Sequence, residues 1–195
     1  MFFLKKYNIK SRNIPIMIAM DFLGGFLFFL PVLALYFEQS LFSVKNVAII
    51  FAVEAMSRAI FEIPTGAISD IFGRRKTIIL KYVITLFSLC FLLIGGSMTM
   101  FVVYAVLGGL AMALGSGTNV SIIYDSLAEN GKEKYYKKVI GIYYAIWPLG
   151  ASLGSIIGSY LASISLRTTV IYTFIPILIS FILTFFLKEP KYHKT

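Results

Sequence analysis

The amino-acid sequence predicts an all-α membrane protein with six transmembrane helices, and three observations lead to this fold class. The 195-residue chain is 58% hydrophobic with a mean hydropathy of +0.85, above the roughly half-apolar composition of soluble domains. Its basic residues alternate between the connections. Apolar runs long enough to cross a bilayer as helices recur along its whole length, at 14–37, 44–69, 77–95, 100–126, 139–164 and 168–187. Because the connections are short, we expect residues 1–195 to form one domain.

The distribution of charge predicts the orientation in the membrane. Bases gather before the first run and after the second, fourth and sixth, whereas the other connections carry only Lys45 and Arg167. The group after the second run comprises Arg74, Arg75, Lys76 and Lys81. By the positive-inside rule both termini are cytoplasmic, as an even number of spans requires. The formal net charge is +9, but these bases are spread over loops. We therefore expect a multi-pass protein of the cytoplasmic (plasma) membrane, with the lipid bilayer and no nucleic acid as its partner.

The first run, 14–37, contains an acid followed by two glycines. Asp21 lies about two turns into the run, and Gly24 and Gly25 let another backbone or a ligand approach closely. Asp21 is a candidate for substrate or proton binding within the membrane. Alternatively, it lies near the cytoplasmic interface and pairs with a base such as Arg12. Prolines within the runs, which predict kinks, are Pro31, Pro148 and Pro176.

The second run, 44–69, carries three ionisable residues. Glu54, Arg58 and Glu62 recur every four residues, so they share one helical face on which Arg58 can pair with either acid. Such a face is not expected to meet lipid. Two interpretations stay open: a structural ion-pair ladder that holds this helix to its neighbours, or a cavity wall that binds substrate or protons.

The third, fourth and fifth runs are marked by one cysteine and by small residues. Cys90 is the sole cysteine, so no intramolecular disulfide can form. Gly150, Gly154 and Gly158 recur every four residues and predict a smooth stripe for close helix packing. The tripeptide LGG occurs in the first run and again in the fourth, an internal match too short to establish a repeat.

The turn between the second and third runs combines glycines, an acid and bases at fixed spacing. The stretch GAISDIFGRRK contains, in order, Gly66, Asp70, Gly73, Arg74, Arg75 and Lys76. We expect Gly66 to permit close helix approach, Asp70 to accept hydrogen bonds from a helix N-terminus, and Gly73 to permit the reversal. Asp125, near the end of the fourth run, is placed to hold Arg74 or Arg75.

This turn resembles the signature loop of the major facilitator superfamily, which implies that it forms a cytoplasmic gate. GASLGSIIGS, 150–159, looks like a degenerate form of the helix-five glycine motif of proton-linked exporters, with Ser155 in place of its proline. Ala111 stands about where the family's helix-four arginine would fall. LKEP, 187–190, resembles the acidic turn that often ends helix six. Together these likenesses cover the chain and imply one half of a major-facilitator-type bundle.

The resemblance implies secondary active transport of a small-molecule substrate by alternating access, with export suggested by the helix-five motif. Asp21, Glu54, Arg58 and Glu62 are then the candidate cavity or proton-coupling residues. Family members carry about twelve spans in two halves, so a second six-helix half or a homodimer partner is expected. The alternative is a non-transporting remnant or assembly partner of a larger transporter. We expect no enzyme, cofactor or metal, because the only histidine, His193, lies in the C-terminal tail.

Overall fold

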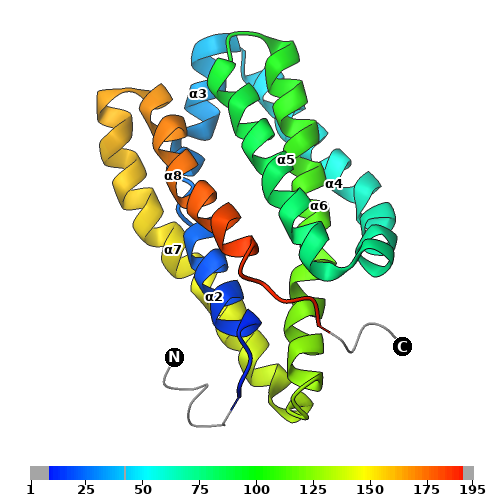
Figure 1. Cartoon of the computed structure of the whole chain (residues 1–195). Coiled ribbons are helices and arrows are strands. Elements are labelled where there is room, and N and C mark those ends of the chain that lie inside the picture. Colours follow the sequence, from blue (N-terminus) through cyan, green and yellow to red (C-terminus); the bar gives the residue numbers. More distant parts are fainter. Residues whose placement is uncertain (1–8, 42, 191–195) are drawn as a thin grey trace.

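The structure, a computed structural model, describes residues 9–41 and 43–190, and His193 lies outside these ranges. Within them every regular element is a helix, as Figure 1 shows, which confirms the all-α class. Two 3-10 segments are η1 (Leu30–Val32) and η2 (Glu133–Tyr135). The α-helices are α2 (Asn13–Gly24), α3 (Leu33–Leu41), α4 (Val44–Phe72), α5 (Arg74–Ile94), α6 (Met98–Ala128), α7 (Tyr136–Ile164) and α8 (Leu166–Thr184).

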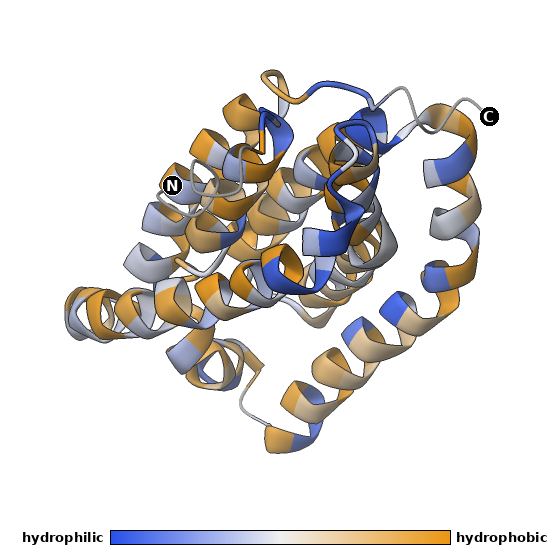
Figure 2. Cartoon of the chain, turned by 90° about the horizontal axis from the view of Figure 1, so that it is seen from below, coloured by the Kyte–Doolittle hydropathy of each residue, from blue (hydrophilic) through white to orange (hydrophobic). Residues whose placement is uncertain are grey.

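Four predicted spans appear as single long apolar helices. α5, α6, α7 and α8 are each long and apolar enough to cross a membrane, and they correspond to the last four predicted runs. α4 has 29 residues, or about 43 Å of helix, which is also enough to cross, although ionisable residues interrupt its apolar stretch. Large apolar side chains such as Ile63 and Ile156 are exposed, and Figure 2 shows hydrophobic residues over the outward sides of the helices. This surface suits a hydrocarbon environment.

The first predicted span is not one continuous helix, so that prediction is wrong. α2 ends at Gly24, and the chain becomes helical again only at η1, whose first turn contains Pro31. Gly25 lies so close to α7 that an added Cβ would be 2.5 Å from the backbone nitrogen of Ala151. The freed backbone N–H of Phe28 donates to Thr173 Oγ1 at 3.1 Å. A break in a spanning helix is tolerated where such partners satisfy the backbone.

The helices form two groups that pack against each other (Figure 1). In one group, α6 packs along both α4 and α5. In the other, α2 packs against both α7 and α8. α5 contacts α8 between the groups, and α6 contacts α2 and α7. Each group therefore contains two spans from one half of the chain and one span from the other half.

The packing of the first half of the chain is repeated in the second half when α2 is matched with α6, α4 with α7 and α5 with α8. Under this matching the α4–α6 contact corresponds to α7–α2, and the α5–α6 contact corresponds to α8–α2. All four of these helix pairs are in contact. Gly109 lies where α6 crosses α4, against the backbone of Arg58, and Gly25 lies where the first span crosses α7, against Gly150. The two copies of LGG therefore occupy equivalent crossings. The short sequence match marks an internal repeat of the fold.

Both ends of the described chain lie at the same end of the bundle (Figure 1). Asn13, at the start of α2, is only 4% exposed. Its Oδ1 accepts a hydrogen bond from the Lys188 backbone N–H, and its Nδ2 donates to the Lys188 carbonyl and to Ser126 Oγ, all at 2.8 Å. Ends on one side agree with an even number of crossings. The assignment of that side to the cytoplasm stays a prediction.

Candidate functional site

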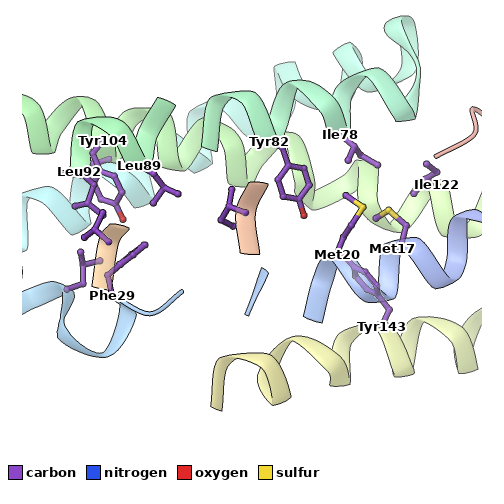
Figure 3. Packing of buried hydrophobic residues seen from close by; sticks show 14 of the residues in the cluster. Met17, Met20, Phe29, Ile78, Tyr82, Leu89, Leu92, Tyr104, Ile122 and Tyr143 are labelled. Atoms are coloured by element: carbon purple, nitrogen blue, oxygen red, sulfur yellow. The ribbon is translucent and has the colours of Figure 1, made fainter. Parts of the chain in front are cut away.

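A cavity of about 530 Å³ lies between the two helix groups. Its wall is rich in aromatic side chains, which are Phe29, Tyr82, Tyr104, Tyr143, Tyr144 and Trp147. In Figure 3, Tyr104 and Phe29 lie toward one end of the packed core, whereas Tyr82, Met20 and Tyr143 lie toward the other. A cavity of this volume is typical of sites for small organic molecules.

Three of the four predicted cavity residues line this space. Asp21 reaches it from α2, and Glu54 and Arg58 reach it from α4. Glu62 is not part of the wall, and its side chain is exposed. A second base, Lys81 of α5, joins the wall. The lining therefore holds two acids and two bases.

The position of Lys81 corrects the sequence analysis, which counted it among the cytoplasmic loop bases. It lies about two turns into α5, where its side chain faces Gly115 so closely that an added Cβ would be 3.1 Å from Nζ. Lys81 lies near enough to Asp21 for the two charges to attract without forming a direct ion pair, and the Asp21 carboxylate accepts a hydrogen bond from Tyr143. Arg12, the alternative partner considered for Asp21, instead lies over the Phe186 ring, 5.5 Å from its centroid. The membrane-embedded acid thus faces a base from another helix.

Glu54 and Arg58 face the cavity one helical turn apart on α4. Glu54 lies beside α6, with its Oε1 3.4 Å from the position that a Cβ on Gly108 would take. The Arg58 side chain is exposed. Among the described residues, no ion pair joins Arg58 to Glu54 or to Glu62. The ion-pair ladder considered above is therefore not formed, and Glu54 and Arg58 line the cavity instead.

Space for the cavity exists beside α6 because small residues occupy its inner face. Gly108, Ala111 and Gly115 all line the cavity, and their spacing of three and four residues places them on one face. Gly108 lies beside Glu54, and Gly115 lies beside Lys81. The helical rise separates these two glycines by about 10 Å. The two sets of charges therefore lie at different levels of the cavity.

The glycine stripe of α7 packs on the interrupted first span. Gly150, Gly154 and Gly158 are all buried. An added Cβ at Gly154 would lie 3.0 Å from the carbonyl oxygen of Gly25, and one at Gly158 would meet the carbonyl oxygen of Phe28. These contacts are made with backbone, which cannot move aside as a side chain can. The stripe therefore lets α7 touch the first span where that span is not helical.

Arg74 connects α4, α5 and α6 at the end of the bundle that carries the termini. Its Nη1 lies 2.6 Å from Asp70 Oδ1 and 2.8 Å from Ser69 Oγ, both near the end of α4. Its Nε lies 3.5 Å from Asp125 Oδ2 on α6. The structure thus places Asp125 against Arg74, one of the two partners considered from the sequence. Charge-assisted contacts of this kind are among the stronger polar interactions in proteins.

The N-terminus of α5 holds the carboxylate of Glu189, which comes from the segment after α8. Its Oε1 accepts a hydrogen bond from the backbone N–H of Arg74 at 2.6 Å, and its Oε2 accepts one from the backbone N–H of Arg75 at 2.9 Å. The positive end of a helix dipole favours an anion there. Gly73 has a φ of 95°, and an added Cβ would lie 2.9 Å from Glu189 Oε1, so both conformation and space require glycine. The LKEP segment thereby fastens the turn between α4 and α5.

The other residues of this turn lie toward the outside. Asp70 was expected at a helix N-terminus, but Glu189 takes that position on α5, and Asp70 pairs with the Arg74 side chain while remaining 61% exposed. Gly66 has no neighbour within 4 Å of its would-be Cβ, and Lys76 is exposed. The close helix approach expected at Gly66 is therefore not made within the described chain.

Sequence reasoning missed three residues of these sites. Lys81 carried a usable signal, because it falls inside an apolar run just as Asp21 does. Glu189 was noted in LKEP, but its helix partner comes from a distant turn. Asn13 carried no signal, since a polar residue before an apolar run is ordinary.

Comparison with known proteins supplies the family. A family profile described as Major Facilitator Superfamily matches residues 16–195. No curated protein sequence matches the chain. The match covers nearly the whole chain and agrees with the signature-like turn and the long apolar helices described above. The chain is a multi-pass integral membrane protein that belongs to the major facilitator superfamily, a family of solute transporters.

Proposed function

We propose that this chain forms one half of a secondary active transporter that moves a small solute across the cytoplasmic membrane by alternating access. The observation that carries the proposal is a cavity between two packed helix groups whose wall holds ionisable residues of both signs. Charged side chains within spans are costly, and a solute pathway is a common reason for their presence. Export is the proposed direction, and the partial glycine motif of the fifth span supports it.

The turn cluster of Asp70, Arg74, Asp125 and Glu189 is the proposed gate. It ties α4, α5, α6 and the segment after α8 together at one end of the bundle. Because α4, α5 and α6 belong to one helix group, separation of the two groups at that end requires the contact between Glu189 and the α5 N-terminus to break. The opposite wall of the pathway is proposed to come from a second six-helix half or a second copy of this chain.

Two-sided labelling of the cavity tests alternating access without knowledge of the solute. Cys90 is exposed and is first replaced by serine. Gly24→Cys then introduces a thiol into the cavity wall at a position with no neighbour within 4 Å. A membrane-impermeant maleimide is added to right-side-out and to inside-out vesicles. Gly117→Cys is the matched control, because Gly117 is equally free of neighbours but lies outside the wall.

Alternating access predicts that Gly24→Cys reacts from both sides, and that Gly117→Cys reacts from neither. Glu189→Gln weakens the contact that joins the two helix groups and should shift labelling of Gly24→Cys toward the cytoplasmic side, with normal abundance. Labelling from one side alone, unchanged by Glu189→Gln, would support the non-transporting alternative instead.

The partner is tested by the mass of the purified, detergent-solubilised chain, corrected for bound detergent. A dimer, or a complex with another six-span polypeptide, supplies the missing wall. A stable monomer of 21.8 kDa would argue that this polypeptide alone does not transport.

A further inference from the structure

The charges that line the cavity balance each other. The wall residues that carry a charge at neutral pH in their ordinary state are two acids, Asp21 and Glu54, and two bases, Arg58 and Lys81. Arg58 is exposed in this chain, but where a bound solute and the opposite wall of the pathway exclude water, a charge without a counter-charge is costly. A solute with a net charge therefore leaves an excess of one sign in the cavity, whereas a solute with no net charge keeps the balance.

The two levels of the cavity differ in the partners of their acids. The Asp21 carboxylate accepts a hydrogen bond from Tyr143 and lies near enough to Lys81 for the two charges to attract, although they form no direct ion pair. Glu54 and Arg58 make no ion pair among the described residues, either with each other or with another group. They lie one turn apart on the same face of α4, so a carboxylate and a guanidinium both face the cavity without a counter-ion. One anionic and one cationic group of a ligand would supply both counter-ions.

The remainder of the wall favours a ligand with an apolar or aromatic body. Tyr104 lies near Glu54, Phe29 lies toward the same end of the core as Tyr104 (Figure 3), and Tyr144 and Trp147 line the cavity from α7. Aromatic rings contribute large apolar contact areas and attract cations over their faces. The cavity volume of about 530 Å³ accommodates a molecule of amino-acid to drug size.

Resting on the transport function proposed above, we propose that the cavity selects a zwitterionic amphipathic solute. Its cationic group meets Glu54, its anionic group meets Arg58, and its apolar body packs on the aromatic wall. The Asp21–Lys81 pair keeps the other level of the cavity electrically neutral. Solutes with the same body but only one of the two charges bind more weakly, because they leave either Glu54 or Arg58 without a partner.

The single tryptophan provides a direct assay. Trp147 is the only tryptophan of the chain, it lines the cavity, and it is 39% exposed. Its fluorescence therefore reports occupancy of the cavity in the purified, detergent-solubilised full chain. Three probes share a phenyl body: phenylalanine is a zwitterion, 2-phenylethylamine is a cation, and 3-phenylpropionate is an anion. We expect phenylalanine to bind saturably, with a dissociation constant at least tenfold below those of the other two.

Substitution of the two α4 charges should change this preference in opposite directions. Glu54→Gln leaves a net positive wall, so the anion should become the best of the three probes. Arg58→Gln leaves a net negative wall, so the cation should become the best. Glu38→Gln removes an exposed acid outside the cavity and should leave the order unchanged.

The proposal is overturned if a singly charged probe binds the unaltered chain as tightly as phenylalanine does. It is also overturned if phenylalanine gives no saturable response, or if the two α4 variants keep the original order of affinities. The titration measures binding and not transport, so these results do not test the transport proposal. That proposal is tested separately by the Gly24→Cys labelling. Selective phenylalanine binding with one-sided labelling would instead overturn transport and leave the ligand class standing.

Discussion

Gly109→Ala is expected to separate α6 from α4 and to destabilise the fold, although alanine is the better helix former. A Cβ at this position would lie 2.6 Å from the carbonyl oxygen of Glu54, 2.7 Å from the backbone nitrogen of Arg58 and 2.7 Å from Ser57 Cβ. Ordinary contact begins at 3.4 Å, so α4 must move away by about 0.8 Å. Two of the three clashing atoms belong to backbone, so no change of rotamer relieves the overlap.

The change in the free energy of unfolding caused by Gly109→Ala is the sum of two opposing contributions. Overpacking of this kind costs about 1–3 kcal/mol, and replacing glycine by alanine inside a helix returns about 1 kcal/mol. Movement of α4 also strains the 2.7 Å hydrogen bond from Ser57 Oγ to the Val106 carbonyl. The net loss of stability is therefore up to about 2 kcal/mol. For a chain of this size it lowers the melting temperature by about 4–8 °C.

The assay is thermal unfolding of the purified chain in detergent, followed by the far-ultraviolet circular dichroism of its helices. Gly117→Ala is the matched control, since it lies in the same helix with nothing within 4 Å of its would-be Cβ. This control should gain only the helix-propensity benefit of alanine over glycine, so it should melt at or above the temperature of the unaltered chain. Equal melting temperatures for Gly109→Ala and Gly117→Ala would refute the reasoning, because they would show that the crossing has room for a methyl group.

The remaining predictions concern two polar contacts. Lys81→Met removes the base near Asp21 and should cost about 1–3 kcal/mol, the usual cost of leaving a buried polar group without its partner. The double variant with Asp21→Asn should recover most of that loss, as melting temperatures would show. Additive single losses would mean that the two charges do not interact. Asn13→Ala removes three hydrogen bonds from a buried side chain and should cost about 2–4 kcal/mol. Asn13→Asp keeps the acceptor for the Lys188 N–H but buries a carboxylate whose second oxygen faces the Lys188 carbonyl oxygen, so it should melt at or below Asn13→Ala. A melting temperature near that of the unaltered chain would contradict this geometry.

Hydropathy predicted α5 to α8 because the length of apolar chain that a bilayer requires is a local property of sequence. The break in the first span is not local. Gly24, Gly25 and Pro31 are also compatible with a continuous or kinked helix. What decides the break is the approach of Gly150 and its neighbours on α7, far along the chain, which only the packed structure reveals.

For the charged residues, too, local spacing predicted some features, whereas the packing of distant helices decided others. The four-residue spacing puts Glu54 and Arg58 on one face of α4, because helical periodicity is regular, and both side chains line the cavity. The same spacing also favoured a ladder with Glu62, and it could not show that these side chains stay apart. The meeting of Lys81 with Asp21 depends on how α5 packs beside α2, and residue spacing along the chain carries no information about that contact.

The contact between Asn13 and Lys188 also has a consequence for the order in which the protein is made. The two residues are 175 positions apart, so at about 5–20 residues per second the partner of Asn13 is synthesised about 10–35 s after Asn13 itself. During that interval the Asn13 side chain lacks its Lys188 partner. The contact between the two residues closes only when translation has passed α8. A nascent chain that stops before residue 188 therefore lacks this link between the start of α2 and the segment after α8.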